Sequence, residues 1–364
     1  MIGAIIGDIV GSRFEFNNTN SLNFKLFTSE CNFTDDTICT IAIADAILKK
    51  KDYKTSLLEW CRKYPNPMGA YGGSFARWIH SSNPQPYNSF GNGSAMRVSP
   101  IGWAFDNKED VILQAEQTAL PTHNHPEGIK GVIATALSIF YGRKFGKEYM
   151  LSAIKEYYPQ FVEPICGGNN FNETCQGTLP ICFGIIDKTR NFEEAIRYAI
   201  AVGGDSDTIG AIVGSIAEAI YGVPQHIYNK ALEYLPKEMQ NVIEKFYIRF
   251  NIDNSCLEPL IKLNLTQEDL LRYCRYYTGE NECPSYKNAL FWDYEKRWIE
   301  LMIENNMLLN EMISVYISNG LRNFERTDNT PISLKSLLFN RYSHWLREDA
   351  DGFKVWYKSE YLNK

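Results

Sequence analysis

The chain has 364 residues, and its 37 basic and 43 acidic side chains give a formal net charge of −6 at pH 7. Hydrophobic residues make up 45% of the sequence and charged residues 22%, which is typical of a globular protein and not of a disordered or fibrous one. The acidic balance argues against nucleic acid or an anionic membrane as a broad partner. No apolar run is long enough to span a bilayer.

Nine cysteines are present without any C-x-x-C pair, and the first residues lack the basic segment that opens a secretory signal. We therefore expect reduced thiols and a cytoplasmic protein. The apolar start of the chain, Met1–Asp8, is predicted to be a buried helix and not a targeting segment.

Helical patterns dominate residues 1–250, where no run of alternating strands is present. Asp110 and Asn191 are expected to cap two of the helices. Small residues are dense in 128–138 and 209–219, which suits closely packed central helices. We therefore expect an all-α core. The apolar periodicity predicts helices over residues 3–12, 37–50, 54–64, 72–80, 109–119, 127–142, 148–157, 176–187, 192–201, 208–221 and 226–234.

Glu15 follows the first predicted helix, whose glycines are regularly spaced. A glutamate one turn beyond a buried helix is commonly only solvated. If it faces a metal or a substrate, it can instead orient a water molecule or approach a leaving group. The sequence leaves both interpretations open.

Two short acidic segments, T-D-D-T and G-G-D-S-D-T, stand in front of apolar helical runs. One such segment alone is an ordinary helix cap. A cap needs only one acceptor, however, and each segment carries two carboxylates, whose repulsion a cation would relieve. If the fold brings the two helix starts together, they form an all-oxygen site for Mg2+ or Mn2+. The candidate ligands are Thr34, Asp35, Asp36, Asp205, Asp207 and Thr208.

A glycine-rich segment, Ser89-Phe90-Gly91-Asn92-Gly93, leads into a helical pattern that begins near Ala95. A loop of this kind can cradle a phosphate or diphosphate with its free backbone N–H groups. Phe90 is then placed to lie against a base or a sugar. The alternative is a tight turn without any ligand.

Two histidines, His123 and His125, precede a proline at the start of the predicted helix 127–142. They lack a third histidine or a cysteine at the spacing of a zinc site. We expect His123 to donate a hydrogen bond to a polar ligand and His125 to be structural.

The composition changes after about residue 250, because four of the seven tryptophans and many tyrosines lie in the last third. Thr266 begins a capping box, and apolar spacing predicts helices within 286–322 and 333–346. We interpret 1–250 as one domain and 251–364 as an aromatic-rich helical C-terminal extension.

Together the motifs of residues 1–225 resemble the ADP-ribosylglycohydrolase family. This family includes dinitrogenase reductase-activating glycohydrolases and the hydrolases of ADP-ribosylarginine and ADP-ribosylserine. The resemblance implies a catalytic domain over 1–250 that is a compact, orthogonal multi-helix globule with a binuclear Mg2+ or Mn2+ centre. The motifs occur in the family's order: G-D-x-x-G-S-x-x-E, T-D-D-T, Y-G-G-S-F, S-F-G-N-G-S-A-M-R, T-H-x-H-P and G-G-D-S-D-T.

Carried over by position, the resemblance assigns roles to the residues of these motifs. Glu15 lies beside the metals and the scissile bond, and either Glu15 or Asp36 takes the proton of the attacking water. The implied metal ligands are Thr34, Asp35, Asp36, Asp205, Asp207 and Thr208. The implied substrate-binding residues are Gly72, Gly73, Ser89, Phe90, Gly91, Asn92, Gly93 and His123.

The implied activity is metal-dependent cleavage of the glycosidic bond between ADP-ribose and a modified protein side chain or small acceptor. The partner would be an ADP-ribosylated protein or a small ADP-ribosyl compound, with neither nucleic acid nor membrane. Two alternatives remain: an ADP-ribose-binding protein without turnover, and a metal-dependent nucleotide phosphohydrolase. The sequence carries no signal for the linkage or the oligomeric state.

Overall fold

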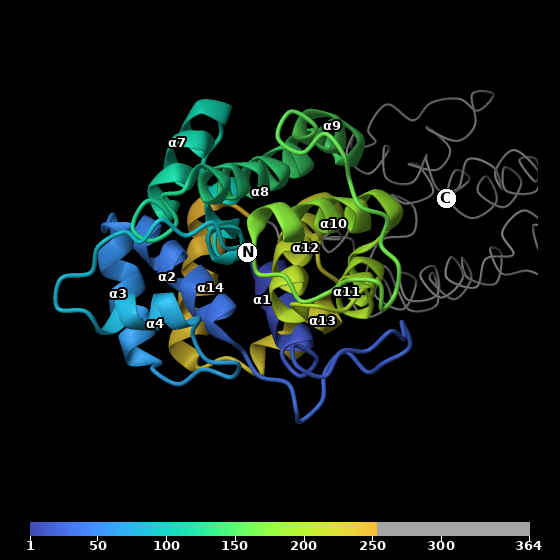
Figure 1. The fold of residues 1–364 in the computed structure, drawn as a ribbon, viewed down its shortest axis with the longest axis horizontal. Coiled ribbons are helices and arrows are strands. Elements are labelled where there is room, and N and C mark those ends of the chain that lie inside the picture. Colours follow the sequence, from blue (N-terminus) through green and yellow to red (C-terminus); the bar gives the residue numbers. More distant parts are fainter. Residues whose placement is uncertain (253–364) are drawn as a thin grey trace, which may run out of the picture. The chain divides into compact units, whose positions relative to one another are not determined.

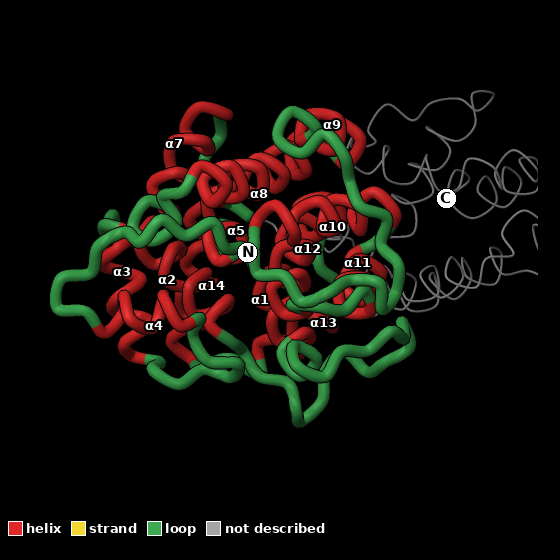
Figure 2. The backbone as a smooth tube through the Cα atoms, viewed as in Figure 1, coloured by secondary structure: helices red, strands yellow, loops and turns green. Residues whose placement is uncertain are grey.

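The computed structural model of the chain describes residues 1–252, and within them it contains fourteen helices and no named strand (Figures 1 and 2). The predicted all-α class is therefore confirmed for this part. The helices expected after Thr266 and within 286–322 and 333–346 lie outside the described residues. None of the described helices is both long and apolar enough to cross a membrane.

Each helix predicted from periodicity overlaps a helix of the structure, with shifts at the ends. The ranges predicted from periodicity do not include the short helices α5 and α6, although a helical pattern is expected from near Ala95. They also omit α14, which begins after Pro236 without a side-chain cap. In chain order the helices are α1 (Ile2–Gly11), α2 (Asp35–Lys49), α3 (Tyr53–Lys63), α4 (Gly73–His80), α5 (Gly93–Met96), α6 (Ser99–Ala104), α7 (Lys108–Ala119), α8 (Pro126–Phe145), α9 (Lys147–Ile154), α10 (Cys175–Lys188), α11 (Phe192–Ala201), α12 (Ser206–Tyr221), α13 (Gln225–Leu232) and α14 (Lys237–Phe250).

One of the two predicted caps is wrong. The cap of α7 is Asn107, whose side chain accepts a hydrogen bond from the backbone N–H of Asp110. Asp110 lies in the first turn of the helix, where its negative charge interacts favourably with the positive end of the helix dipole. Asn191 caps α11 as predicted and accepts from the backbone N–H of Glu194.

Helices α1 and α12 lie side by side at the centre of the described helices (Figure 1). Every residue of α1 is buried. Its glycines face those of α12 so closely that a Cβ atom placed on Gly7 would lie 1.8 Å from the carbonyl oxygen of Gly210. A Cβ atom on Gly3 would lie 2.2 Å from the carbonyl oxygen of Gly214. The two backbones are therefore in direct contact, which only glycine permits.

The other helices surround this central pair. Helix α2 packs against α1, α3 and α14, and α8 packs against α7, α9 and α12. Tyr247 of α14 donates a hydrogen bond to Glu218 of α12 and accepts one from the backbone N–H of Ile2. These bonds join the start of α1 to the last turns of α12 through α14.

We expect the substitution Gly7→Ala to destabilise the fold by about 3 kcal/mol, because the added methyl group overlaps backbone atoms that have no room to move. Urea unfolding followed by circular dichroism measures this loss. Gly72→Ala is the matched control, since no atom lies within 4 Å of a Cβ placed there. An unchanged midpoint for Gly7→Ala would show that α1 and α12 separate at little cost.

Candidate active site

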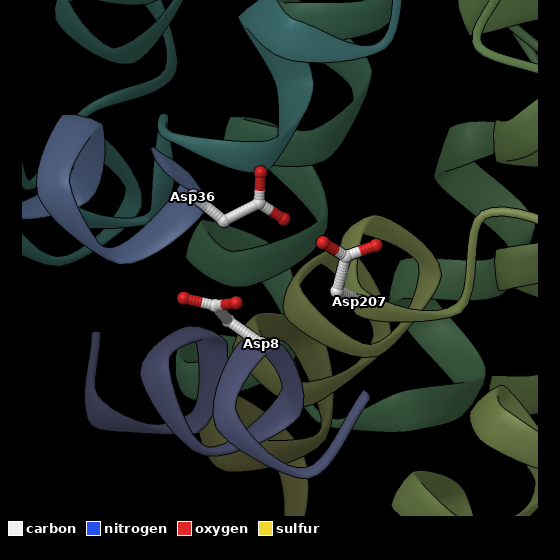
Figure 3. Close-up of side chains that lie close together, drawn as sticks. All are labelled: Asp8, Asp36 and Asp207. Atoms are coloured by element: carbon white, nitrogen blue, oxygen red, sulfur yellow. The ribbon is translucent and has the colours of Figure 1, made fainter. Parts of the chain in front are cut away.

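Three aspartates from three different helices meet at the centre of the described residues. Asp8 lies in α1, Asp36 in the first turn of α2 and Asp207 in the first turn of α12. Their carboxylates point toward one another (Figure 3), and one oxygen of each lies within 4.8 Å of the others. All three side chains are buried.

No lysine or arginine within residues 1–252 forms an ion pair with any of these carboxylates. Burial, and next the charge of neighbouring aspartates, raises the pKa of Asp36 and of Asp207 well above the ordinary value. The Oδ2 atom of Asp36 and the Oδ1 atom of Asp207 are buried without a hydrogen-bond partner. Converging oxygens with free lone pairs and no counter-charge fit a hard divalent cation.

Asp8 was not among the predicted ligands. Its Oδ2 atom accepts hydrogen bonds from the backbone N–H groups of Thr34 and Thr37, each at 3.0 Å, and from the Thr37 hydroxyl. These bonds oppose the effect of burial, which raises the pKa of Asp8 to about 6. Asp8 therefore fixes the start of α2 beside α1. The signal that would have identified it is its place as the sole charged residue in an apolar helix.

The predicted ligands of the first acidic segment occupy the start of α2. Thr34 is the N-cap, and its side chain accepts from the backbone N–H of Asp36. Asp35 is half-buried, and burial followed by the charge of Asp8 raises its pKa. Asp35 lies outside the tight group of three carboxylates.

The second acidic segment meets the first across the helix starts. The Thr208 hydroxyl lies 3.5 Å from Oδ1 of Asp36 and donates a hydrogen bond to it. Asp205 also lies outside the group of three and accepts a hydrogen bond of 2.7 Å from the side-chain amide of Asn92. The structure thus brings together the two segments that are far apart in the sequence.

Glu15 lies close to these acidic groups on the loop that follows α1. Burial, and next the charges of Asp205 and Asp8, raises its pKa to about 7. Its Oε2 atom is buried without a hydrogen-bond partner. A Cβ atom on Gly69 would lie 2.5 Å from that oxygen, so the glycine leaves the room that the carboxylate occupies. Glu15 therefore has a free oxygen and a proton affinity suited to proton transfer near neutral pH.

The Glu15 loop is tied to the turn that delivers Asp205. The Asn18 side chain donates to the carbonyl oxygen of Gly204 at 2.9 Å and accepts from its N–H at 2.8 Å. The Asn169 side chain donates to the carbonyl oxygen of Gly203 at 3.1 Å. Both glycines have a φ angle of +82°, a backbone conformation that residues other than glycine rarely adopt. Two loops distant in sequence thus clamp one turn.

The glycine-rich segment forms a loop that ends at the start of α5. The backbone N–H of Gly91 donates to the Ser89 hydroxyl at 3.1 Å, and the side chain of Asn92 reaches Asp205. The His123 ring lies against the loop, because its Nε2 atom would be 3.1 Å from a Cβ on Gly93. The loop is therefore in contact with both the histidine and the second acidic segment.

The aromatic ring of Phe90 is partly exposed, and its centroid lies 5.2 Å from that of the His125 ring. His125 caps α8 by accepting from the backbone N–H of Glu127, which agrees with the structural role predicted for it. Gly72 and Gly73 begin α4, and no hydrogen bond given for the described residues joins them to the acidic cluster. Their place in the site remains a prediction.

Comparison with known proteins identifies the group to which this site belongs. Residues 1–255, which include all the residues discussed above, match the family described as ADP-ribosylglycohydrolase. This chain belongs to the ADP-ribosylglycohydrolase family. The resemblance predicted from the motifs is thereby confirmed.

Curated relatives carry names of the same activity class. Human ADP-ribosylhydrolase ARH3 is 26% identical, with 62% of this chain and 85% of the relative covered. The dinitrogen reductase ADP-ribosyl glycohydrolase of Rhodospirillum rubrum is 25% identical over 61% of this chain and 84% of its own length. The ADP-ribosylarginine hydrolase of Pseudomonas putida is 24% identical over 61% and 70%. All three relatives are named as ADP-ribosyl hydrolases or glycohydrolases.

A solved structure described as an ADP-ribosylglycohydrolase-related protein complex shares the fold. Its TM-score is 0.54 at 23% identity, with 68% of this chain and 95% of the other chain covered. The predicted ADP-ribosylglycohydrolase-like helical globule is therefore confirmed.

We expect Asp207→Asn to stabilise the metal-free protein, because it removes a buried negative charge that has no partner. Burial and the neighbouring aspartates raise the pKa of Asp207 well above its ordinary value of 3.8, so above that pH the native state binds more protons than the unfolded state and loses stability as the pH rises. The gain in unfolding free energy should be at least about 1 kcal/mol at neutral pH. It should shrink toward pH 4.

Thermal unfolding of both proteins in excess chelator measures this difference. Asp106→Asn is the control, because Asp106 is exposed and forms ion pairs with Lys144 and Arg143. Hydrogen bonds from these two residues lower the pKa of Asp106 in the folded state, so this substitution should be destabilising. If Asp207→Asn were less stable than the parent protein in chelator, the claim that Asp207 carries an unpaired buried charge would be wrong.

Proposed function

We propose that the chain is a metal-dependent hydrolase that cleaves the glycosidic bond between ADP-ribose and a modified protein side chain or small acceptor, releasing ADP-ribose. The observation that carries this proposal is the pair of buried, partnerless oxygens of Asp36 and Asp207 beside the free carboxylate oxygen of Glu15. A cation site next to a group able to accept a proton is what hydrolysis of such a bond requires. Membership of the family supports the same activity.

The residues fit two Mg2+ or Mn2+ ions, since all are hard oxygen donors. When bound, the ions would orient the distal ribose hydroxyls and a water molecule at the bond that breaks. The proposed ligands are Thr34, Asp35, Asp36, Asp205, Asp207 and Thr208. Asp8 supports this set by holding the start of α2 through its hydrogen bonds to Thr34 and Thr37.

Glu15 is the better candidate for the general base. One oxygen of Asp36 already accepts a hydrogen bond from Thr208, and the other faces the acidic cluster. Glu15 stands outside that cluster and keeps a buried oxygen without a partner. It is therefore free to take the proton of the attacking water while the positive charge that develops on the ribose lies near the aspartates.

The loop Ser89–Gly93 and His123 are proposed to hold the diphosphate and the adjoining ribose, with Phe90 against the base or sugar. The small side chains of the loop leave room for an anion, whereas the N–H groups of Ser89, Gly91 and Asn92 already donate to acceptors within the protein. Gly72 and Gly73 are proposed to line the same side. Asn92 links this loop to the metal segment through Asp205, so that the ligand and the ions are held by connected groups.

We further propose that 1–250 is the catalytic domain and that 251–364 is an extension outside the family's fold. A cytoplasmic location is consistent with the free thiols of all six cysteines in the described part of the chain. The partner would be an ADP-ribosylated protein or a small ADP-ribosyl compound.

The function is tested by release of free ADP-ribose from arginine-, serine- and guanine-linked ADP-ribosyl compounds and from O-acetyl-ADP-ribose, with Mg2+ or Mn2+ and with chelator. We expect chelator-sensitive release from at least one substrate. Asp36→Asn should abolish both this release and the rise in melting temperature on adding metal. Release of AMP would instead indicate a phosphohydrolase, and binding of ADP-ribose without any release would indicate a binding protein.

For Glu15→Gln we expect kcat to fall by about 10²–10⁴-fold, the usual contribution of a general base, while the metal-induced rise in melting temperature persists. Steady-state kinetics and thermal unfolding on the same preparation provide both measurements. Glu30→Gln is the matched control, because Glu30 lies on the same loop and is exposed. Near-normal turnover by Glu15→Gln would exclude Glu15 as the base.

A further inference from the structure

Arg97 is a buried cation without an anionic partner. It follows α5 directly and is 1% exposed. No carboxylate within residues 1–252 forms an ion pair with it, and its Nε atom is buried without a hydrogen-bond partner. Burying an unpaired charge costs free energy, so the bonds that Arg97 does make are informative.

The Arg97 side chain makes two hydrogen bonds with the end of α7 and the turn after it. Its Nη2 atom donates to the carbonyl oxygen of Thr118 at 3.0 Å and to the hydroxyl oxygen of Thr122 at 2.8 Å. The Phe75 ring lies 5.9 Å away on another side. The guanidinium is therefore directed at Thr122 and not at solvent.

The hydroxyl group of Thr122 also contacts His123. The Thr122 hydroxyl oxygen lies 2.7 Å from Nδ1 of His123. Because arginine can only donate, the hydroxyl oxygen is the acceptor of the Arg97 bond, and its own hydrogen needs a different partner. The partner that the described residues offer to this hydrogen is Nδ1 of His123. With this pairing Nδ1 carries no hydrogen, and the neutral ring carries its hydrogen on Nε2.

The Nε2 atom faces the ligand loop. It would lie 3.1 Å from a Cβ on Gly93 and 3.6 Å from a Cβ on Gly91. The centroid of the Tyr87 ring lies 6.2 Å from that of the His123 ring, and no carboxylate within residues 1–252 forms an ion pair with this histidine. Burial, and next the charge of Arg97, lowers the pKa of His123 well below its ordinary value. The ring is therefore held neutral with a single donor aimed at the loop.

We propose that Arg97 is a positioning residue that acts through Thr122 to fix His123 as the Nε2–H tautomer, so that the loop Ser89–Gly93 presents a directed donor to an acceptor oxygen of its ligand. The identity of that ligand, a phosphate or ribose oxygen of ADP-ribose, rests on the proposed function. The assignment of the His123 tautomer does not depend on the proposed function. In this arrangement His123 provides an oriented hydrogen-bond donor, and Arg97 provides a positive charge close to it.

The tautomer is read by nitrogen NMR of the full-length chain labelled at histidine, with His123→Gln to assign the ring signals. In the parent protein at neutral pH, we expect a protonated Nε2 and an unprotonated Nδ1 for His123. Thr122→Val removes the hydroxyl with little change in shape and should convert this signature to an average of both tautomers. A protonated Nδ1 in the parent protein would overturn the proposal.

Thr118→Val is the matched control, because Thr118 is buried in the same region but its hydroxyl donates to the carbonyl oxygen of Ala115. Its backbone carbonyl, which accepts from Arg97, is unchanged. We expect this variant to keep the parent signature. If Thr118→Val averages the tautomers as Thr122→Val does, general loosening of the region explains the effect and the relay is excluded.

Calorimetric titration with ADP-ribose gives the functional measurement. We expect Thr122→Val to weaken binding by about tenfold, or about 1.4 kcal/mol, and Thr118→Val to leave it unchanged. Arg97→Lys retains the charge without the planar fork and should also average the tautomers. If the chain hydrolyses none of the test compounds but shows the Nε2–H signature, the proposed function fails and the relay stands. An unchanged affinity in Thr122→Val would overturn the role in binding.

Discussion

Helices α1 and α12 touch backbone to backbone, since Gly3 and Gly7 face Gly214 and Gly210 without any side chain between them. Asp8 of α1 and the first turn of α12 are carried to the same point by this contact. Asp8 then draws in the start of α2 through Thr34 and Thr37. The acidic cluster therefore depends on one glycine seam, and a larger residue in the seam would move the carboxylates apart.

The buried carboxylates of Asp8, Asp36 and Asp207 repel one another, and without a neutralising cation this repulsion destabilises the folded protein. Burial and mutual repulsion raise the pKa of Asp36 and Asp207, and two oxygens lack any donor. The apolar core around α1, α8 and α12 supplies the stability that holds these groups in place. A cation bound at the proposed site would neutralise this repulsion, and it would therefore stabilise the folded protein.

The parts of the site that the sequence predicted are those with local signals. Adjacent aspartates before an apolar helix are visible as letters, and so are the glycines of the loop before α5. Asp8 carries a local signal as the sole charged residue of an apolar helix, but its hydrogen-bond partners at the start of α2 become visible only in the folded chain. The bond between Asn92 and Asp205 joins residues 113 positions apart and leaves no local pattern. The four-residue α5 and the six-residue α6 span fewer than two helical turns, so they show no repeated apolar spacing.

Asn92 belongs to both halves of the site. Its backbone N–H donates to the carbonyl oxygen of Glu173 in the loop before α10, while its side chain holds Asp205 and Thr178. Any ligand that reorders the glycine-rich loop therefore also changes the freedom of Asp205. Under the proposed function linkage requires reciprocity: any factor by which the ion raised the affinity for the ADP-ribosyl ligand would equal the factor by which that ligand raised the affinity for the ion. The Asn92 side-chain amide would then couple the two binding events.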